Sequence, residues 1–282
     1  MEYVTLSNGV RMPQLGYGVY QVAREECERC VLDALSVGYR HIDTAQAYQN
    51  EEQVGSAVEK SGVPRGEIFI TSKVWVDRYG YDECRKSVSE SLEKLRTDYI
   101  DLMLLHQPFA DYYGAWRALE DLYGEGKLKA IGISNFYPDR MVDIASFARI
   151  RPMVNQIETH PHDQQLEAQK WMEKYGVKHE SWAPFGEGRN GLFADATLAE
   201  IGSKYGKTTA QVMLRWQIQH GIIVIPKSTH KERMAENFDV FDFALSAGDM
   251  ERIAALDRKQ SAFFSHQDPA TVEWFVGIIK GA

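Results

Sequence analysis

The chain has 282 residues, of which 44% are hydrophobic and 26% are charged, and its formal net charge is −8. These values are typical of a soluble globular enzyme, and the length fits one closed α/β barrel, so we expect a single domain over residues 1–282. Lys and Arg are scattered without a basic stripe, which argues against a nucleic-acid partner. The net charge does not exclude a small ligand that carries phosphate, because a local group of cations decides such binding.

The cysteines and the apolar runs exclude several other classes of protein. Cys27 and Cys30 form a CxxC pair inside a predicted helix, with no second pair and no His nearby, and Cys84 stands alone. We therefore expect reduced, half-buried cysteines and no metal site. The first residues lack the pattern of a signal peptide, and the longest apolar runs, such as residues 222–225, are far too short to span a membrane. These observations predict a cytoplasmic monomer with no membrane contact.

The chain begins with a predicted β-hairpin, in which residues 4–6 and 10–12 flank the turn sequence Ser7-Asn8-Gly9. Eight short apolar runs of strand type follow, separated by stretches with the apolar periodicity of helices. Their spacing of about 25 to 33 residues, and about 44 before the last run, is typical of repeated βα units. The runs centre on Leu15, His41, Ile70, Met103, Ile131, Asn155, Glu180 and Val224.

The long final gap predicts an extra helix over residues 196–205, ahead of a helix over residues 209–220. Eight strands in alternation with helices fit either a closed barrel or an open doubly wound sheet. A dinucleotide-binding doubly wound sheet needs a GxGxxG turn after its first strand, and residues 16–21 lack the third glycine. We therefore predict an α/β fold of the (β/α)8 TIM-barrel type. The aromatic, apolar tail from Gln260 onward is expected to fold over the active-site end.

Polar side chains follow the predicted strands at the barrel end where active sites lie. Asp43 and Tyr48 follow the second strand, Lys73 ends the third and His106 ends the fourth. Singly, each residue has an ordinary structural explanation: Asp43 as a turn cap, Lys73 in any ion pair, and His106 as a satisfied loop histidine. Four such groups at adjacent strand ends favour a common site. The later strands contribute Ser134, Asn135, Gln156, Trp182, Lys227 and Ser228.

This set of side chains suits proton donation by a phenol. A free tyrosine has a pKa of about 10, which is high for a general acid near neutral pH. The Lys73 ammonium is expected to lower the pKa of Tyr48, and Asp43 is expected to hold Lys73 charged and in place. His106 would then hydrogen-bond and orient the substrate oxygen.

Five sequence runs carry a resemblance to a known family. They are His41-Ile42-Asp43-Thr44-Ala45-Gln46-Ala47-Tyr48, Ile70-Thr71-Ser72-Lys73-Val74-Trp75, Leu104-Leu105-His106-Gln107-Pro108, Lys127-Leu128-Lys129-Ala130-Ile131-Gly132-Ile133-Ser134-Asn135-Phe136 and Ile225-Pro226-Lys227-Ser228. The chain resembles the aldo-keto reductase superfamily from the hairpin to about Asn237. Glu51-Glu52 and the short length resemble its bacterial diketogluconate reductase and methylglyoxal reductase branches.

The resemblance implies NADPH-dependent reduction of a small aldehyde or ketone to an alcohol. It implies Asp43, Tyr48, Lys73 and His106 as the catalytic tetrad, in agreement with the reasoning from residues. Ser134, Asn135 and Gln156 would bind the nicotinamide carboxamide, and Trp182 would stack on the nicotinamide ring. Lys227, Ser228 and Arg233 would hold the adenosine 2′-phosphate, with Glu236 and Asn237 at the adenine. Two cations favour a phosphate over a ribose hydroxyl pair, which predicts NADPH over NADH.

Two positions depart from the family pattern. Gln107 stands where many members have a tryptophan, which makes the substrate pocket less aromatic, and Glu187 stands in the cofactor-clamping loop where vertebrate members often have a serine. The residues expected to line the substrate pocket are Tyr20, Trp75, His106 and Gln107. His106 favours carbonyl over alkene reduction, because members that reduce steroid double bonds have a glutamate there.

Two alternative functions fit the same fold. A lyase or isomerase with Lys73 as a Schiff-base nucleophile leaves the nicotinamide and phosphate motifs without a role. A cofactor-binding regulatory barrel without activity is disfavoured by the intact tetrad.

Overall fold

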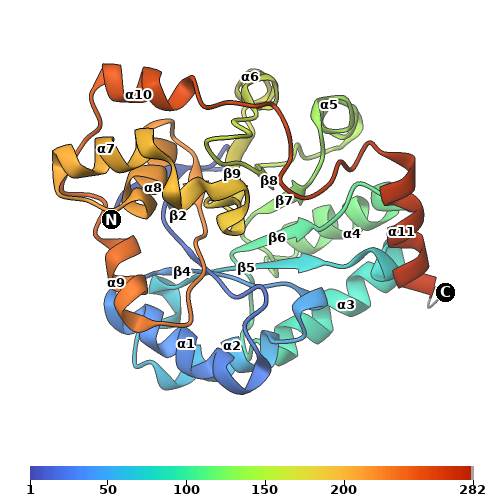
Figure 1. Ribbon diagram of the computed structural model, residues 1–282. Helices are drawn as coiled ribbons and strands as arrows, with labels where there is room; N and C mark the ends of the chain where they lie inside the picture. Colours follow the sequence, from blue (N-terminus) through green and yellow to red (C-terminus); the bar gives the residue numbers. More distant parts are fainter. Residues whose placement is uncertain (281–282) are drawn as a thin grey trace.

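The computed structural model describes residues 1–280 and contains an eight-stranded parallel sheet that curls into a barrel (Figure 1). The strand order is β10-β9-β8-β7-β6-β5-β4-β3. The strands are β3 (Tyr17–Gly18), β4 (His41–Asp43), β5 (Phe69–Val74), β6 (Leu102–Leu105), β7 (Ile131–Ser134), β8 (Val154–Glu158), β9 (Lys178–Trp182) and β10 (Ile223–Val224). The predicted (β/α)8 fold is confirmed.

Backbone hydrogen bonds between the first and last strand segments close the barrel. Leu15 forms a parallel bridge with Val224. The Gly16 amide donates to Val224 O at 2.8 Å, and the Val224 amide donates to Gln14 O at 2.9 Å. The regular part of the first strand begins two residues after its predicted centre, yet that centre, Leu15, still pairs across the closure.

Helices surround the strands (Figure 1). They are α1 (Arg24–Val37), α2 (Glu51–Lys60), α3 (Tyr81–Lys94), α4 (Tyr112–Gly124), α5 (Pro138–Phe147), α6 (Leu166–Tyr175), α7 (Ala196–Tyr205), α8 (Thr209–Gln219), α9 (Lys231–Phe238), α10 (Ala247–Ala254) and α11 (Pro269–Lys280). Three short 3-10 helices are η1 (Gln46–Tyr48), η2 (Arg65–Glu67) and η3 (Val76–Arg78). The longer segment η4 (Gly186–Ala194) is interrupted at residues 187–191, whose backbone is not helical.

The extra helix predicted over residues 196–205 is present as α7, and helix α8 follows it directly. Local sequence explains three of the boundaries of these helices. The Asp195 side chain accepts from the Leu198 amide at the start of α7, and Gly206 ends that helix in the left-handed conformation. Helix α8 begins with a capping box formed by Thr208 and Gln211.

One prediction about the helices is wrong. Cys27 and Cys30 are fully buried rather than half-buried, because they lie three residues apart on the face of α1 that is packed into the core with Val31 and Ala34. Burial also raises the pKa of Cys27 to about 12, which keeps this thiol protonated and unreactive at neutral pH.

The two ends of the barrel are covered by different parts of the chain. The predicted hairpin forms as β1 (Tyr3–Thr5) and β2 (Arg11–Pro13), and Asn8 in its turn donates to Lys129 O at 2.9 Å, near the amino end of β7. At the carboxyl end, the Phe275 ring of α11 lies 6.2 Å from the Trp75 ring, which directly follows β5. The expected position of the tail is confirmed (Figure 1).

The described residues contain neither a membrane-spanning helix nor a metal-binding cluster. No helix within residues 1–280 combines the length and the apolar character needed to cross a membrane. Within the same residues, no group of three or more His, Cys, Asp or Glu side chains is arranged to hold a metal ion.

Gly16 lies at the closure of the barrel, where no space is left for a side chain. A Cβ atom there would lie 2.4 Å from Nδ1 of His41, whose ring is fully buried. We expect Gly16→Ala to lower the free energy of unfolding by about 1–3 kcal/mol, as overpacking in a core does. Gly248→Ala is the matched control, because its Cβ would meet nothing within 4 Å in α10. Urea unfolding of both variants checks this; equal effects would contradict the role of Gly16.

Candidate active site

The ammonium of Lys73 is the centre of the candidate site. Its Nζ donates to Asp43 Oδ1 at 2.6 Å, to Thr44 O at 2.9 Å and to the Tyr48 hydroxyl at 3.3 Å. The Lys73 side chain is fully buried in the barrel. Three of the four predicted catalytic side chains are therefore joined by direct hydrogen bonds.

His106 completes the group. Its ring lies 5.6 Å from the Tyr48 ring and 5.0 Å from the Trp75 ring, both in edge-on geometry. Tyr20 lies on another side of Tyr48, with the ring centres 5.0 Å apart, and is half exposed. Tyr20 and His106 thus pack against the Tyr48 ring, and Trp75 lies beside His106. Their contact with substrate stays a prediction.

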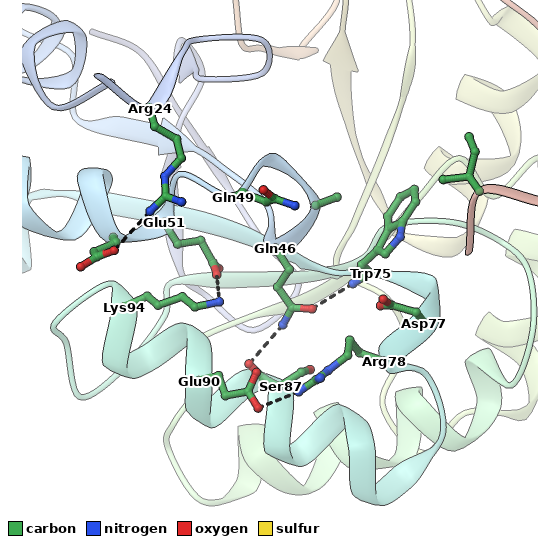
Figure 2. Close-up of a pocket in the computed structure, with 13 residues that line it drawn as sticks. Arg24, Gln46, Gln49, Glu51, Trp75, Asp77, Arg78, Ser87, Glu90 and Lys94 are labelled. Carbon is green, nitrogen blue, oxygen red and sulfur yellow. Dashed lines mark hydrogen bonds and ion pairs between the residues drawn. The ribbon is translucent and has the colours of Figure 1, made fainter. Parts of the chain in front are cut away.

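Gln46 positions the segment that carries Tyr48, a role that the sequence does not reveal. Its Oε1 accepts from the Trp75 amide at 3.0 Å, and its Nε2 donates to Ser87 O at 3.2 Å and to Ser91 Oγ at 3.1 Å (Figure 2). Gln46 thus ties η1 to α3 and to the end of β5. A polar residue two positions before a tyrosine is too common in sequences to predict such a contact.

Burial dominates the electrostatics of the tetrad. It raises the pKa of Tyr48 to about 12, although the neighbouring Lys73 ammonium acts in the opposite direction. Lys73 thus acts in the predicted direction, but burial of the phenol has the larger effect, so the pKa of Tyr48 rises rather than falls. Burial also lowers the pKa of His106 well below its usual range, so the imidazole is neutral at neutral pH. Burial by itself would lower the pKa of Lys73. The neighbouring Asp43 and Tyr48 have the larger combined effect, so the pKa of Lys73 is raised.

The residues expected at the nicotinamide lie together beside the tetrad. Gln156 Nε2 donates to Asp43 Oδ2 at 2.8 Å, and the Ser134 hydroxyl donates to Gln156 O at 2.9 Å. Asn135 donates to His106 O at 3.0 Å and accepts at Oδ1 from Trp182 Nε1 at 2.9 Å. The Trp182 ring remains partly exposed. The side chains thus form a connected polar floor next to an aromatic face, which fits a carboxamide-bearing ring.

The residues expected at the adenosine 2′-phosphate lie around the start of α9. Lys227 and Arg233 are exposed, and neither forms an ion pair with any residue in the 1–280 range. Ser228 is buried, and its hydroxyl accepts from the His230 amide at 3.1 Å. Two uncompensated cations beside a helix amino end fit a phosphate group.

Glu236 and Asn237, the residues expected at the adenine, lie further along α9. Glu236 Oε1 accepts from the Thr208 hydroxyl at 2.8 Å, which links α9 to the start of α8. Asn237 is buried. In this structure Glu236 is therefore engaged with the protein itself, and its contact with adenine stays a prediction.

A cavity of about 630 Å³ lies between η1, η3 and α3 (Figure 2). Trp75 lines it, and the Trp75 ring also packs against His106, which does not line it. Most of its charged lining residues are already paired. Arg78 contacts Glu90 at 2.7 Å, Arg24 contacts Glu52 at 3.5 Å, and Lys94 lies 3.9 Å from buried Glu51. Trp75 is the one predicted site residue among those that line it. This cavity is distinct from the tetrad.

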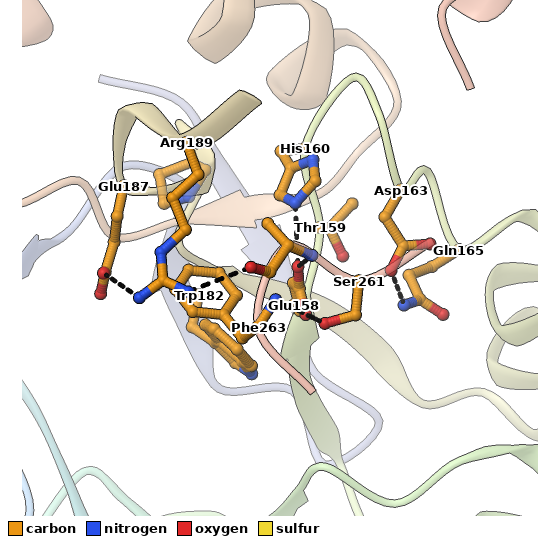
Figure 3. Close-up of polar contacts among 12 residues, drawn as sticks. Glu158, Thr159, His160, Asp163, Gln165, Trp182, Glu187, Arg189, Ser261 and Phe263 are labelled. Atoms are coloured by element: carbon orange, nitrogen blue, oxygen red, sulfur yellow. Dashed lines mark hydrogen bonds and ion pairs between the residues drawn. The ribbon is translucent and has the colours of Figure 1, made fainter. Parts of the chain in front are cut away.

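The tail and η4 together enclose Trp182, and sequence reasoning did not identify these contacts (Figure 3). Phe263 packs against the Trp182 ring with centres 5.1 Å apart, and the Arg189 guanidinium lies 4.3 Å above the Phe263 ring. Arg189 also donates to Ala262 O at 3.1 Å. Glu187, a departure from the family pattern, lies 3.7 Å from Arg189. The loop is therefore held by the tail through Arg189.

The tail is also attached to the end of β8 (Figure 3). The Glu158 carboxylate accepts from the Ser261 hydroxyl at 2.6 Å and from the Ala262 amide at 2.7 Å. His160 Nε2 lies 2.9 Å from the same carboxylate. Residues 261–263 are thus held between the end of β8 and the Trp182 ring, on the side of the site expected to bind the nicotinamide.

Gln107 and the tail histidine His266 lie beyond His106. Gln107 is buried, and its backbone exchanges hydrogen bonds with the Tyr79 hydroxyl at 3.0 and 2.8 Å, while its Oε1 has no partner among the described residues. The His266 ring stacks between Phe109 and Phe275. Gln107 therefore places a side-chain oxygen that can accept a hydrogen bond next to His106, where many family members have a tryptophan ring.

Comparisons with known proteins agree with this geometry. The aldo/keto reductase family model matches residues 7–258. The chain is 46% identical to a glyoxal reductase of Bacillus subtilis, over 91% of this chain and 93% of that protein. It is 42% identical to methylglyoxal reductase DkgA of Escherichia coli K12, over 90% of this chain and 93% of that protein. Both are bacterial relatives, as the resemblance of residues 51–52 suggested.

Solved structures give the same result. The Bombyx mori aldo-keto reductase in complex with NADP superposes with a TM-score of 0.90 at 33% identity, and the match covers 96% of each chain. An aldo/keto reductase from Brucella melitensis gives a TM-score of 0.88 at 43% identity, covering 91% of this chain and 99% of that one. The resemblance seen in the sequence motifs is thereby confirmed, and the chain belongs to the aldo/keto reductase family.

Proposed function

We propose that this enzyme reduces small aldehydes and ketones with NADPH, and that Tyr48 donates the proton to the carbonyl oxygen. The observation that carries the proposal is the contact of one buried ammonium, Lys73, with both Asp43 and Tyr48, beside a neutral His106. Relatives named glyoxal reductase and methylglyoxal reductase make α-dicarbonyl compounds the first substrates to test. Loss of nicotinamide absorbance with a panel of aldehydes, ketones and keto-sugars tests the activity.

Tyr48 is protonated at neutral pH, because burial raises its pKa to about 12. A proton held this firmly is released only when the phenolate that remains is stabilised. Once the proton has left, the phenolate oxygen faces the Lys73 ammonium at 3.3 Å, and this contact stabilises the anion. Asp43 keeps Lys73 charged throughout. Lys73 therefore acts mainly on the product state of the proton transfer.

The neutral imidazole of His106 orients the carbonyl. An N–H group of a neutral histidine can donate to a carbonyl oxygen placed next to the Tyr48 hydroxyl. NADPH supplies the hydride when it is bound. Asn135, Gln156 and Trp182 are proposed to hold its nicotinamide, and Lys227 and Arg233 are proposed to hold its 2′-phosphate.

The alternative functions fit the geometry less well. A Schiff-base enzyme needs a lysine that is accessible and can lose its proton, whereas Lys73 is fully buried and gives hydrogen bonds to three oxygen atoms. A regulatory barrel without activity would have no need for an assembled tetrad.

Tyr48→Phe removes the proposed proton and keeps the ring. We expect turnover to fall by at least about 10²–10⁴-fold, the usual contribution of general acid catalysis, with NADPH affinity almost unchanged. Steady-state kinetics and a fluorescence titration of NADPH check this. Tyr81→Phe, which removes a surface hydroxyl from α3, is the control. Turnover of Tyr48→Phe within a few-fold of the parent enzyme would exclude Tyr48 as the donor.

Arg233→Ala tests the recognition of the 2′-phosphate. The loss of one charge-assisted contact costs about 1.5–3 kcal/mol, which is about a ten- to hundredfold loss in NADPH affinity. The affinity for NADH should hardly change, since it lacks the phosphate. Lys231→Ala is the matched control, because Lys231 lies on the same helix and is paired with Asp33. An equal loss for both cofactors would show that Arg233 does not read the phosphate.

His106→Glu tests the orienting role of the imidazole. We expect the turnover of a good aldehyde substrate to fall, because a carboxyl group cannot place an N–H donor beside Tyr48. Parallel kinetics of the variant and the parent enzyme with one aldehyde measure the loss. Unchanged aldehyde turnover would remove His106 from the proposed mechanism.

A further inference from the structure

The interior of the barrel holds a second carboxyl group, Glu180 on β9, which the proposed mechanism does not use. Its side chain is fully buried, and neither carboxyl oxygen has a hydrogen-bond partner among the described residues. Its Oε1 lies 3.7 Å from His41 Nε2. A buried, unpartnered carboxyl group is costly when charged, so its presence calls for a physical explanation.

Glu180 is linked to the tetrad through its neighbours. His41 lies beside it on β4, and its register partner on β8 is Gln156. Gln156 donates to Asp43, which pairs with Lys73, and the charges of Asp43 and Lys73 both act on the pKa of Glu180. On its other side the register partner is Ile223 of β10, which brings no charge. Glu180 is thus electrostatically coupled to the same ammonium that contacts Tyr48.

The charge balance of this interior favours a neutral Glu180 at neutral pH. Lys73 and Asp43 already compensate each other at 2.6 Å. Burial lowers the pKa of His41 to about 3, so His41 supplies no positive charge. Burial, with the Asp43 charge adding to it, raises the pKa of Glu180 to about 8. An ionised Glu180 would leave one net negative charge inside the barrel.

We infer that Glu180 is a positioning residue that controls the acidity of Tyr48 through Lys73. In its uncharged form it leaves the ammonium directed at Asp43 and Tyr48. In its ionised form it adds a negative charge that attracts Lys73 and destabilises the Tyr48 phenolate. This inference rests on the proposed role of Tyr48 as proton donor, and it predicts that carbonyl reduction slows when Glu180 loses its proton.

The direction in which the rate changes with pH distinguishes Glu180 from Tyr48 and Lys73. Tyr48 and Lys73, whose pKa values are raised, keep their protons across the mildly alkaline range. A loss of rate in this range therefore reports on another group. We expect the single-turnover rate of carbonyl reduction by the parent enzyme, measured with saturating NADPH, to fall about three- to tenfold between pH 7 and pH 9.5.

Glu180→Gln keeps the shape of the side chain and removes its titration. We expect the ratio of the rates at pH 9.5 and pH 7 to rise to near one, while KM for the carbonyl changes little at either pH. Glu51→Gln is the matched control: Glu51 is also buried with a raised pKa, but it bonds to Ser72 and lies outside the tetrad. Its rate ratio should equal that of the parent. The same alkaline loss in Glu180→Gln and the parent would overturn the inference.

Infrared spectroscopy separates this inference from the proposed function, because it needs no turnover. The parent enzyme should show a carbonyl band of a protonated carboxyl group at pH 7 that disappears by pH 9.5 and is missing from Glu180→Gln. If Glu180→Gln does not fold, Glu180→Met is used in its place. If neither variant folds, the carboxyl band is titrated in Glu51→Gln. Its loss between pH 7 and pH 9.5 supports the inference, and its persistence overturns it. A carboxyl band that does not titrate between these pH values would overturn the inference even if Tyr48→Phe is inactive.

Discussion

The buried ion pair between Lys73 and Asp43 is the interaction on which the rest of the site depends. Both side chains lie almost completely out of solvent, and their atoms are 2.6 Å apart. Removing one partner of such a pair costs about 3–5 kcal/mol, because the other charge is left buried without compensation. The barrel meets this constraint by bringing β4, β5 and η1 together, so that Thr44 and Tyr48 complete the hydrogen bonds of the ammonium. A fixed ammonium then becomes available to stabilise a phenolate.

The ionisable groups around this pair are neutral, and burial is the common reason. Tyr48 has a pKa of about 12, His41 one of about 3, and the pKa of His106 is well below its usual range. The site therefore contains one compensated pair and several groups that each have a single protonation state at neutral pH. In such an environment a single added charge has a large effect, which is why Glu180 matters for Tyr48.

Two segments remote in sequence complete the mouth of the barrel. The η4 loop and the tail meet over Trp182, where Arg189 contacts both the Phe263 ring and the backbone of Ala262. Glu158 at the end of β8 fixes the same stretch of tail. The aromatic face proposed for the nicotinamide is thus shaped by side chains that come from separate loops. A change in the tail is expected to affect both the substrate and the cofactor side.

The sequence by itself determined the barrel, because eight apolar runs in regular alternation with amphipathic helices leave few other folds. It also predicted that the four candidate catalytic side chains lie together, as they do, since residues at the carboxyl ends of adjacent parallel strands converge. It did not determine the acidity of Tyr48, because the sequence shows Lys73 but not the depth of burial, which has the larger effect. Nor did it show that Glu180 and Lys73 share the barrel interior, or that Arg189 is joined to the tail, since these residues are over 70 positions apart in the sequence. Only the closure of the barrel decides which distant side chains share its interior.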